Sequence, residues 1–259
     1  MRVVACIKQV PSSNKVRFDP ANHTIIRSAK QSVVNPFDKH AVEEAVRIKE
    51  QLDCEVVVVS MGIPSVEALL RDSLARGADR AVLLSDAAFA GADTLATSKT
   101  LAAGIRSLGG ASLVICGKMA VDGDTAQVGP ELAENLNIHH ITDVCEVQQI
   151  TDRYIRVKKN TGRGFCILEA RLPALITVTR EINLPRLPTL AGVRRSLTAP
   201  VTLLRKDDLA LGEDSAGRSG SATRVVRTYT PDRNAECVFI RGDAADQATS
   251  LLRIIKEQV

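Results

Sequence analysis

The stretch SLVICGKMAVDGDTAQVGPELAENL, residues 112–136, decides the fold. Its first five residues form an apolar run typical of a buried strand, and the run breaks at Gly117 into a loop of small and polar residues. The chain then resumes as a helix with Leu132, Ala133 and Leu136 on one face. A strand, a loop and a helix in this order predict a parallel sheet, whose ligand crevice lies at the carboxyl end of the strand.

The loop offers groups that suit a phosphate or a ribose. Backbone N–H groups, hydroxyls and amides come from Asp122, Gly123, Asp124, Thr125, Gln127 and Gly129. An ordinary strand-to-helix connection is also often rich in Gly and Asp. The pattern alone therefore leaves two alternatives open, a nucleotide site and a plain connection.

The string CGKMAVDGDTAQVGPELAENL closely resembles the nucleotide loop of the β subunit of electron transfer flavoproteins. Five further blocks resemble the same family, in the family's order, over nearly the whole chain: ACIKQVP (5–11), VVNPFDKHAVEEAVRIKE (33–50), GADTLATS (91–98), LPALITVTREINLPRLPTL (172–190) and SGSATRVVRTYTP (219–231). The resemblance implies an α/β fold of the adenine nucleotide alpha-hydrolase-like type, a parallel sheet with flanking helices, to which antiparallel strands and an extended C-terminal arm are added.

Composition and charge exclude several classes of protein. Of the 259 residues, 45% are hydrophobic and 25% are charged, which is ordinary globular composition rather than disorder. A net charge of +4 with dispersed Lys and Arg gives no patch for nucleic acid. The apolar N-terminal run is too short to span a membrane and lacks the layout of a signal peptide, so we expect a cytoplasmic protein without membrane insertion.

The cysteines and histidines do not suggest metal or hydrolytic chemistry. No pair has CxxC spacing and most lie in apolar runs, so we expect mainly buried thiols at Cys6, Cys54, Cys116, Cys145, Cys166 and Cys237. His139 and His140 have no acidic cluster nearby, and we expect them to be solvated linker residues. No metal site and no catalytic triad can be placed.

The first half of the chain alternates between strand and helix patterns. Strands are predicted at 3–8, 55–60, 81–84 and 113–116, and helices at 39–50, 65–75 and 93–108, which indicates a parallel sheet with helices on both faces. Asp93 or Thr94 is expected to cap the third helix. The helix after the 112–136 loop has two candidate starts: Asp124 as the cap with Gln127 as its capping-box partner, or Pro130 as the first helical residue.

The second half of the chain changes in pattern. Short alternating runs over 144–178 predict antiparallel strands, with a hairpin turn at residues 161–164. We expect a nucleotide-binding α/β domain over 1–182, and over 183–259 a partner-recognition loop and arm with a flexible connector at 215–221. A terminal helix is predicted over 243–259, with an apolar face at Leu251, Leu252 and Ile255. The resemblance implies that this arm wraps around an α subunit.

The resemblance also implies which residues surround an adenosine phosphate: Cys6, Asn35, Pro36, Phe37, Asp38, Met61, Asp122, Gly123, Asp124, Thr125, Ala126, Gln127, Val128 and Gly129. Asn35 can offer a donor and an acceptor to an adenine edge or a ribose, while Asp38 can serve as a helix N-cap, alone or in addition. The family's non-bifurcating members hold AMP in this pocket, and its electron-bifurcating members hold the ADP half of a second FAD.

The block at 91–98 bears on the choice between AMP and a second FAD. Asp93, Thr94 and Thr97 open a helix and could hold a pyrophosphate or a flavin edge, whereas simple N-capping explains only Asp93 or Thr94. Together with the loop at 122–129, this block resembles the bacterial NADH-linked branch of the family. The chain departs from that branch at Ser12 and Ser13, where Asp is usual, and at residues 159–163, where an acidic residue is usual. The second FAD is the favoured alternative.

Residues 180–190 resemble the loop by which the family recognises dehydrogenases. Leu190 matches the anchoring leucine, whereas Leu184 and Leu187 replace the usual Glu and Tyr. A leucine on a loop braced by prolines can fill a partner's pocket at low ordering cost. The alternative is that these leucines pack the arm onto the α subunit.

The resemblance therefore implies the β subunit of a heterodimeric flavoprotein, an electron carrier rather than a stand-alone enzyme. It would carry electrons between a flavin dehydrogenase, of the acyl-CoA or hydroxy-acid type, and a redox partner, with FAD as cofactor and NADH as a donor if it bifurcates. One alternative is a non-bifurcating subunit that holds only structural AMP. Another is a non-redox adenine-nucleotide-binding protein, although the GxxxxGK[ST] phosphate loop is missing.

Overall fold

The structure is a computed structural model that describes residues 1–12, 32–212, 214–227, 229 and 237–258. Its contacts divide the chain into two compact units, Met1–Val225 and Val226–Val259. The first unit contains the sheet that carries the candidate site. Part of the block at 219–231 lies outside the described residues.

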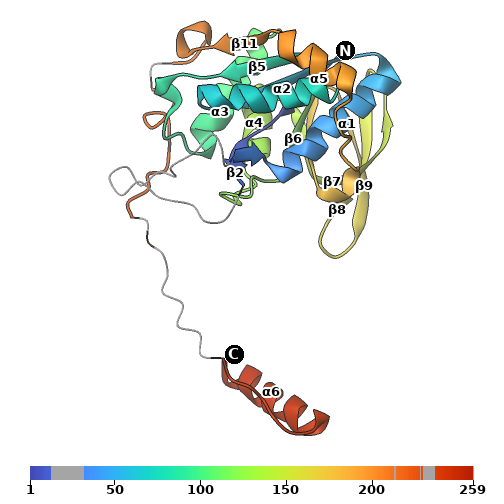
Figure 1. Ribbon diagram of the computed structural model, residues 1–259, viewed down its shortest axis with the longest axis vertical. Coiled ribbons are helices and arrows are strands. Elements are labelled where there is room, and N and C mark those ends of the chain that lie inside the picture. The colour runs from blue at the N-terminus through green and yellow to red at the C-terminus, as the bar shows by residue number, and fades with distance from the viewer. Residues whose placement is uncertain (13–31, 213, 228, 230–236, 259) are drawn as a thin grey trace. The chain divides into compact units, whose positions relative to one another are not determined.

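A nine-stranded sheet forms the centre of the first unit (Figure 1), in the order β11-β5-β4-β1-β6-β10-β7-β8-β9. Neighbouring strands from β11 to β7 are parallel, and β8 and β9 continue the sheet as antiparallel strands. The strands are β1 (Arg2–Cys6), β4 (Glu55–Met61), β5 (Arg80–Leu84), β6 (Leu113–Gly117), β7 (His139–Ile150), β8 (Tyr154–Asn160), β9 (Phe165–Arg171), β10 (Ala174–Val178) and β11 (Val201–Leu204). A separate antiparallel pair joins β2 (Gln9–Pro11) to β3 (Ser32–Val34).

Helices cover both faces of this sheet. Alternate residues of the apolar strands point to opposite faces, so Val3 and Ala5 enter one core cluster and Val4 and Cys6 enter the other. The first cluster includes residues of α1 (Pro36–Leu52) and α2 (Glu67–Ala75), and the second includes residues of α3 (Thr94–Ser107) and α4 (Val128–Leu136). The expected α/β architecture is confirmed.

The predicted elements of the first half are all present, with shifted ends. Pro36 is the first residue of α1, because its fixed φ suits that position, and the helix therefore starts before the expected residue 39. A short 3-10 helix, η2 (Pro64–Val66), precedes α2, and another, η3 (Ala87–Phe89), follows β5. Both expected starts of α4 are wrong, because the helix begins at Val128 with Gln127 as its N-cap residue.

Two expectations for the middle of the chain need correction, and a third is confirmed. The run ALITV was expected to be antiparallel, but β10 lies between β6 and β7 and is parallel to both. All five of its residues are buried, as in strands covered on both faces of a parallel sheet. His139 and His140 are exposed, but they begin β7 and are not linker residues. The hairpin turn at 161–164 is confirmed, since Thr161 N–H donates to Gly164 O between β8 and β9.

The first unit continues past the expected boundary at 182/183. After the short η4 (Arg180–Ile182) come α5 (Leu190–Thr198), β11 and η5 (Lys206–Asp208), and β11 pairs with β5. Leu209 and Ala216 are buried in the core. Residues 215–221 are not a flexible connector, because Ser219 Oγ donates to Ala216 O and Arg218 N–H donates to Ala90 O.

The second unit contains one helix, α6 (Ala244–Gln258), in its described part. Asp243 accepts hydrogen bonds of 2.9 Å from the N–H groups of Ala245 and Asp246, which stabilises the start of the helix. Leu251, Leu252 and Ile255 are each half exposed or more, so the expected terminal helix with an apolar face is confirmed.

The described cysteines are all free, and they differ in exposure. Cys6, Cys54 and Cys116 are buried as expected, whereas Cys145 and Cys166 are half buried and Cys237 is exposed. Among the described residues, no helix combines the length and the apolar character that crossing a bilayer requires.

Candidate functional site: the carboxyl edge of the parallel sheet

The predicted site residues follow the carboxyl ends of neighbouring parallel strands. Cys6 ends β1 and Met61 ends β4, and the loop at 118–127 follows β6. Residues 35–38 form the start of α1, which packs on β1 and β6. In parallel α/β sheets this edge is where ligands bind.

Asn35 holds the loop in place from the start of α1. Its side-chain Nδ2 donates to Met119 O at 2.8 Å and to Asp38 Oδ1 at 2.9 Å, and its Oδ1 accepts from Val121 N–H at 3.2 Å. Asn35 is almost fully buried. Both halves of its amide are thus engaged within the chain. Asn35 therefore helps to shape the loop, and its expected contact with an adenine edge or a ribose stays a prediction.

Asp38 is not a helix cap. The helix already begins at Pro36, and the Asp38 carboxylate accepts hydrogen bonds from Lys8 N–H at 2.7 Å and from the Asn35 amide. Burial raises the pKa of Asp38 to about 7, although these hydrogen bonds act in the opposite direction. The carboxyl group therefore joins the chain just after β1 to the start of α1, beneath the loop. In the sequence Asp38 looked like a cap because it stands just before the helical run AVEEAV.

Lys8 contacts the candidate loop and was not among the residues predicted for the site. Its Nζ lies 2.7 Å from Asp122 Oδ1, and the Asp122 side chain is only 7% exposed. Asp122 therefore faces Lys8 and ties the loop to the end of β1. Lys8 lies inside the block ACIKQVP, where its charge next to a buried strand was the available signal.

The loop backbone has a geometry that suits an anion. Asp124 and Ala126 have positive φ angles of 49° and 53°, and Gln127, which follows Ala126, is in the right-handed helical region. A left-handed residue followed by a right-handed one turns successive N–H groups toward one side, which is the geometry of an anion-binding nest. No side chain caps the start of α4, and the positive end of the helix dipole lies at the same point.

The glycines of the loop differ in role. A Cβ on Gly123 would meet nothing within 4 Å, so no contact within the described chain requires glycine there. A Cβ on Gly129 would lie 2.5 Å from Thr177 Cγ2, and Gly129 is buried. Gly129 therefore allows α4 to pack on β10, and Val128 beside it is partly buried against the core. Thr125 is exposed, as are Asp124, Ala126 and Gln127.

The start of α3 lies beside the start of α4. Asp93 caps α3, since its Oδ1 accepts from Ala96 N–H at 2.9 Å, and its Oδ2 accepts from the backbone N–H and the hydroxyl of Thr223. Burial opposes the ionised form of Asp93, but these hydrogen bonds prevail and lower its pKa. Its oxygens are engaged within the chain, so the capping alternative holds for Asp93. Thr97 is partly exposed, one turn further along α3.

Thr94 and Glu131 join the two helix starts. The Thr94 hydroxyl donates to Glu131 Oε1 at 3.0 Å and lies 3.4 Å from Gln127 Oε1. Glu131 Oε2 is buried and makes no hydrogen bond with the described residues. A buried acceptor without a donor is costly, so this oxygen suits a hydroxyl supplied by a ligand. Sequence patterns do not single out Glu131, because Glu in a first helical turn is common.

A cavity of about 980 Å³ continues from the loop toward the β8–β9 hairpin. It is lined by Phe37, Lys118, Met119, Val121, Asp124, Asp143, Lys159, Asn160, Thr161, Gly162, Thr179, Arg180 and Glu181. The Arg180 guanidinium lies 4.6 Å from the centre of the Phe37 ring, and Lys118 pairs with Asp143 at 2.6 Å. The cavity has the volume and mixed polarity of a site for a large organic cofactor.

The predicted partner residues are exposed. Leu184, Leu187 and Leu190 are 89%, 83% and 91% accessible. Leu190 was expected on a loop, but it is the first residue of α5, whose start is capped by Thr189 Oγ1, which accepts from Gly192 N–H at 3.0 Å. Three exposed leucines within a short segment indicate an interaction surface.

Comparison with known proteins bears directly on this arrangement. The family described as Electron transfer flavoprotein domain matches residues 22–209. The "Electron transfer flavoprotein subunit beta" of Thermoanaerobacterium thermosaccharolyticum is 42% identical over 253 residues, which are 97% of this chain and 96% of that protein. The "Caffeyl-CoA reductase-Etf complex subunit CarD" of Acetobacterium woodii is 40% identical over 100% of this chain and 99% of its own length. The "Acryloyl-CoA reductase electron transfer subunit gamma" of Anaerotignum propionicum is 35% identical over 97% of both chains.

These matches cover the parallel sheet, the loop after β6 and the exposed leucines. They confirm the resemblance that the sequence blocks indicated. Matches of this length and identity show that the chain belongs to the electron transfer flavoprotein family, as a subunit of the β type whose role is electron transfer.

Proposed function

We propose that this chain is one half of an αβ electron carrier and that the loop at 122–129 binds the phosphate of an adenine nucleotide. The observation that carries the proposal is the uncapped start of α4, where the turned backbone of Ala126 and Gln127 presents N–H groups to a single point. Lys8 and Asn35 hold the loop in this shape, so the site is organised before a ligand arrives.

The donors and acceptors at this site fit a nucleotide. The N–H groups from Thr125 to Gly129 would hold a phosphate, and Glu131 Oε2 would accept a hydrogen bond from a ribose hydroxyl. Met61 and Cys6 would form the apolar floor at the ends of β4 and β1. The side chains of Glu131, Met61 and Cys6 are free to contact the nucleotide in this way. Those of Asp122 and Asn35, in contrast, hold the loop in place.

We further propose that the nucleotide is the adenosine half of a second FAD rather than AMP. Thr94 of α3 reaches the uncapped start of α4, so a pyrophosphate bound at that start would also lie beside the start of α3, whereas the single phosphate of AMP needs only the start of α4. The cavity of about 980 Å³ next to the loop leaves room for the remainder of a dinucleotide. A bound flavin supplies one- and two-electron redox chemistry, and the protein positions it and sets its electrostatic surroundings.

The partners that we propose are an α subunit and a dehydrogenase that acts on CoA esters. Two relatives are named as subunits of a caffeyl-CoA reductase complex and of an acryloyl-CoA reductase, which favours the acyl-CoA type over a hydroxy-acid dehydrogenase. The exposed leucines at 184, 187 and 190 would meet the dehydrogenase, and the second unit with α6 would contact the α subunit. NADH would be the donor to the flavin in this subunit.

The experiment is to co-express the chain with an α subunit, purify the complex and test it against a panel of acyl-CoA and hydroxy-acid dehydrogenases. Flavin absorbance would follow reduction by NADH and electron exchange with each dehydrogenase. We expect NADH to reduce the complex and an acyl-CoA dehydrogenase to exchange electrons with it fastest. A complex that contains no flavin, or a flavin that exchanges electrons with none of the dehydrogenases, would overturn the proposal.

A further inference from the structure

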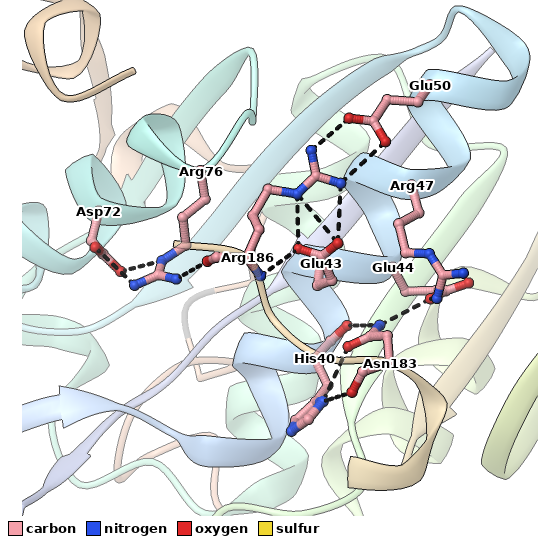
Figure 2. Close-up of polar contacts among 9 residues, drawn as sticks. All are labelled: His40, Glu43, Glu44, Arg47, Glu50, Asp72, Arg76, Asn183 and Arg186. Atoms are coloured by element: carbon pink, nitrogen blue, oxygen red, sulfur yellow. Dashed lines mark hydrogen bonds and ion pairs between the residues drawn. The ribbon is translucent and has the colours of Figure 1, made fainter. Parts of the chain in front are cut away.

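The segment at 183–190 lies on α1 with its polar groups facing the protein and its leucines facing outward. Leu184, Leu187 and Leu190 are 89%, 83% and 91% exposed, while Arg186 and Asn183 are partly buried against α1 (Figure 2). This is the reverse of ordinary packing, in which leucines are buried and arginines remain in solvent.

Residues 183–189 have no regular secondary structure of their own. The short helix η4 ends at Ile182 and α5 begins at Leu190, so no helix or sheet hydrogen bonds run through this stretch of the described chain. The conformation of the segment must therefore come from its side-chain contacts and from Pro185 and Pro188, which restrict the backbone.

Arg186 supplies most of these contacts. Its guanidinium faces Glu43, with Nε 2.9 Å from Oε2 and Nη2 3.0 Å from Oε1, and its backbone N–H donates to Glu43 Oε2 at 2.9 Å. The other edge of the guanidinium faces Glu50, with Nη1 2.5 Å from Oε1 and Nη2 3.1 Å from Oε2. Figure 2 shows Arg186 between these two carboxylates of α1. Arginine can bridge two carboxylates in this way because its donors form a planar fork, which lysine lacks.

We call the ion pairs of Arg186 with Glu43 and Glu50 the clamp, and this clamp is partly protected from water. The Glu43 side chain is 7% exposed and the Arg186 side chain is 32% exposed, whereas Glu50 is 57% exposed. The Glu50 carboxylate interacts chiefly with Arg186, which lowers its pKa. The pair of Arg186 with Glu43 is therefore the stronger half of the clamp, since water and salt screen a shielded ion pair with two hydrogen bonds less than an exposed one.

Hydrogen bonds to α1 and α2 also hold the segment on both sides of the Arg186 side chain. Asn183 Nδ2 donates to His40 O at 3.0 Å and to Glu44 Oε2 at 2.9 Å, which fixes the beginning on α1. On the other side, Arg76 of α2 donates to Arg186 O, and Figure 2 shows Arg76 held in turn by Asp72. Downstream, α5 packs on α2, where Arg195 Nη2 donates to Leu74 O and Ala78 O.

We propose that Arg186, held by Glu43 and Glu50, is the positioning residue that presents the three exposed leucines to the dehydrogenase and thereby sets its affinity. The inference rests on the proposed function, because it takes the dehydrogenase as the occupant of the leucine surface. Because ion pairs and hydrogen bonds hold the segment on α1, the leucine side chains remain exposed for a partner. A segment that is already ordered loses little conformational entropy on binding. Loosening the clamp lowers the fraction of molecules with a binding-competent surface, and the apparent affinity falls by the same factor.

The first test measures the segment directly and needs no dehydrogenase. Hydrogen–deuterium exchange is followed on peptides covering residues 184–193 in the purified αβ complex, for the wild type, Arg186→Ala and Arg186→Lys. We expect faster exchange in Arg186→Ala and an intermediate rate in Arg186→Lys, with unchanged exchange in the strands of the sheet. Unchanged exchange at 184–193 in Arg186→Ala overturns the proposal.

The second test separates affinity from chemistry, using the acyl-CoA dehydrogenase that exchanges electrons fastest with the wild-type complex. We expect Arg186→Ala to raise KM for that dehydrogenase about tenfold, with kcat within about twofold and the flavin content unchanged. Glu50→Gln removes only the exposed half of the clamp and is expected to raise KM about threefold. This milder variant decides the question if Arg186→Ala does not fold. Arg156→Ala, which breaks the exposed pair with Glu169 on the outer strands, is the matched control.

A double variant distinguishes positioning from general destabilisation. If Arg186 acts through the leucines, Arg186→Ala added to Leu190→Ala raises KM by less than about twofold, because the anchor is already lost. Fully additive effects, or faster exchange at 184–193 with an unchanged KM, overturn the proposal. If no dehydrogenase exchanges electrons with the complex, the proposed function fails and the claim about affinity fails with it. The exchange measurement still decides whether Arg186 fixes the segment.

Discussion

Asp38 shows how burial at a single residue determines both its chemistry and its effect on stability. The carboxyl group lies beneath the candidate loop, and burial raises its pKa from 3.8 to about 7. A group with a higher pKa in the folded than in the unfolded state binds more protons when folded. Its contribution to stability is thus complete below about pH 4 and is lost as the pH rises toward 7.

The first prediction follows from this sign. Between pH 5 and 8 the free energy of unfolding of the wild-type complex decreases because the buried Asp38 carboxyl ionises. Asp38→Asn removes that part of the pH dependence. At pH 5 the variant is less stable than the wild type by about 1–3 kcal/mol, because its amide –NH₂ faces a donor, Lys8 N–H or the Asn35 amide, where an acceptor is needed, and this difference becomes smaller at pH 8 as Asp38 of the wild type ionises. Chemical denaturation at the two pH values measures both effects. Parallel pH profiles for the two proteins would contradict the assignment.

The second prediction uses two glycines of the same loop as a matched pair. Gly123→Val should empty the nucleotide site while the melting temperature of the nucleotide-free protein stays the same, because the chain leaves open space around this position. Gly129→Ala should lower the melting temperature, since the new Cβ would meet Thr177 Cγ2 at 2.5 Å. Nucleotide content after acid release and a thermal melt report the two outcomes. Full nucleotide content in a folded Gly123→Val protein would remove this residue from the site.

At the scale of elements, helix starts depend on contacts that local patterns do not contain. The capping of α3 by Asp93 was predictable, because an Asp before an apolar periodic run is a local signal. The start of α4 was not, because Gly129 packs against β10, a strand that comes much later in the chain. The same limit applies to Arg186 and Glu43, which are 143 residues apart in sequence.

The third prediction concerns the first residue of α5. Leu190→Ala should slow electron transfer to the dehydrogenase and leave FAD content and αβ assembly intact, because the side chain is 91% exposed and contributes little to the core. Loss of a buried anchor costs about 2–4 kcal/mol at a well-packed interface, or ~30- to 1000-fold in affinity. Stopped-flow rates against dehydrogenase concentration measure this loss.

Leu203→Ala is the control for Leu190→Ala. Leu203 is also an exposed leucine, 47% accessible on the edge strand β11, but it lies outside the segment at 183–190. Its loss should leave the rates unchanged. Dissociation of the αβ pair in Leu190→Ala would show instead that this leucine packs against the α subunit.

At the scale of the whole molecule, the sequence predicted the class of fold and the edge of the sheet that carries the site. The apolar runs of β1, β4 and β6 and the helices between them were sufficient for that. The place of β10 was missed because a fully buried run looks the same in parallel and antiparallel pairs. The extent of the first unit was missed because β11 is short and partly exposed, and only its pairing with β5 includes it in the sheet.

We expect this chain to contribute a nucleotide site of its own to an αβ flavoprotein. The most direct measurement is to release the cofactors of the purified αβ complex with acid and to count FAD and AMP by chromatography, for the wild type and for Gly123→Val. We expect two FAD and no AMP per wild-type pair, and one FAD per Gly123→Val pair. One FAD with one AMP in the wild type would contradict the second FAD, and counts that Gly123→Val leaves unchanged would contradict a nucleotide site at this loop.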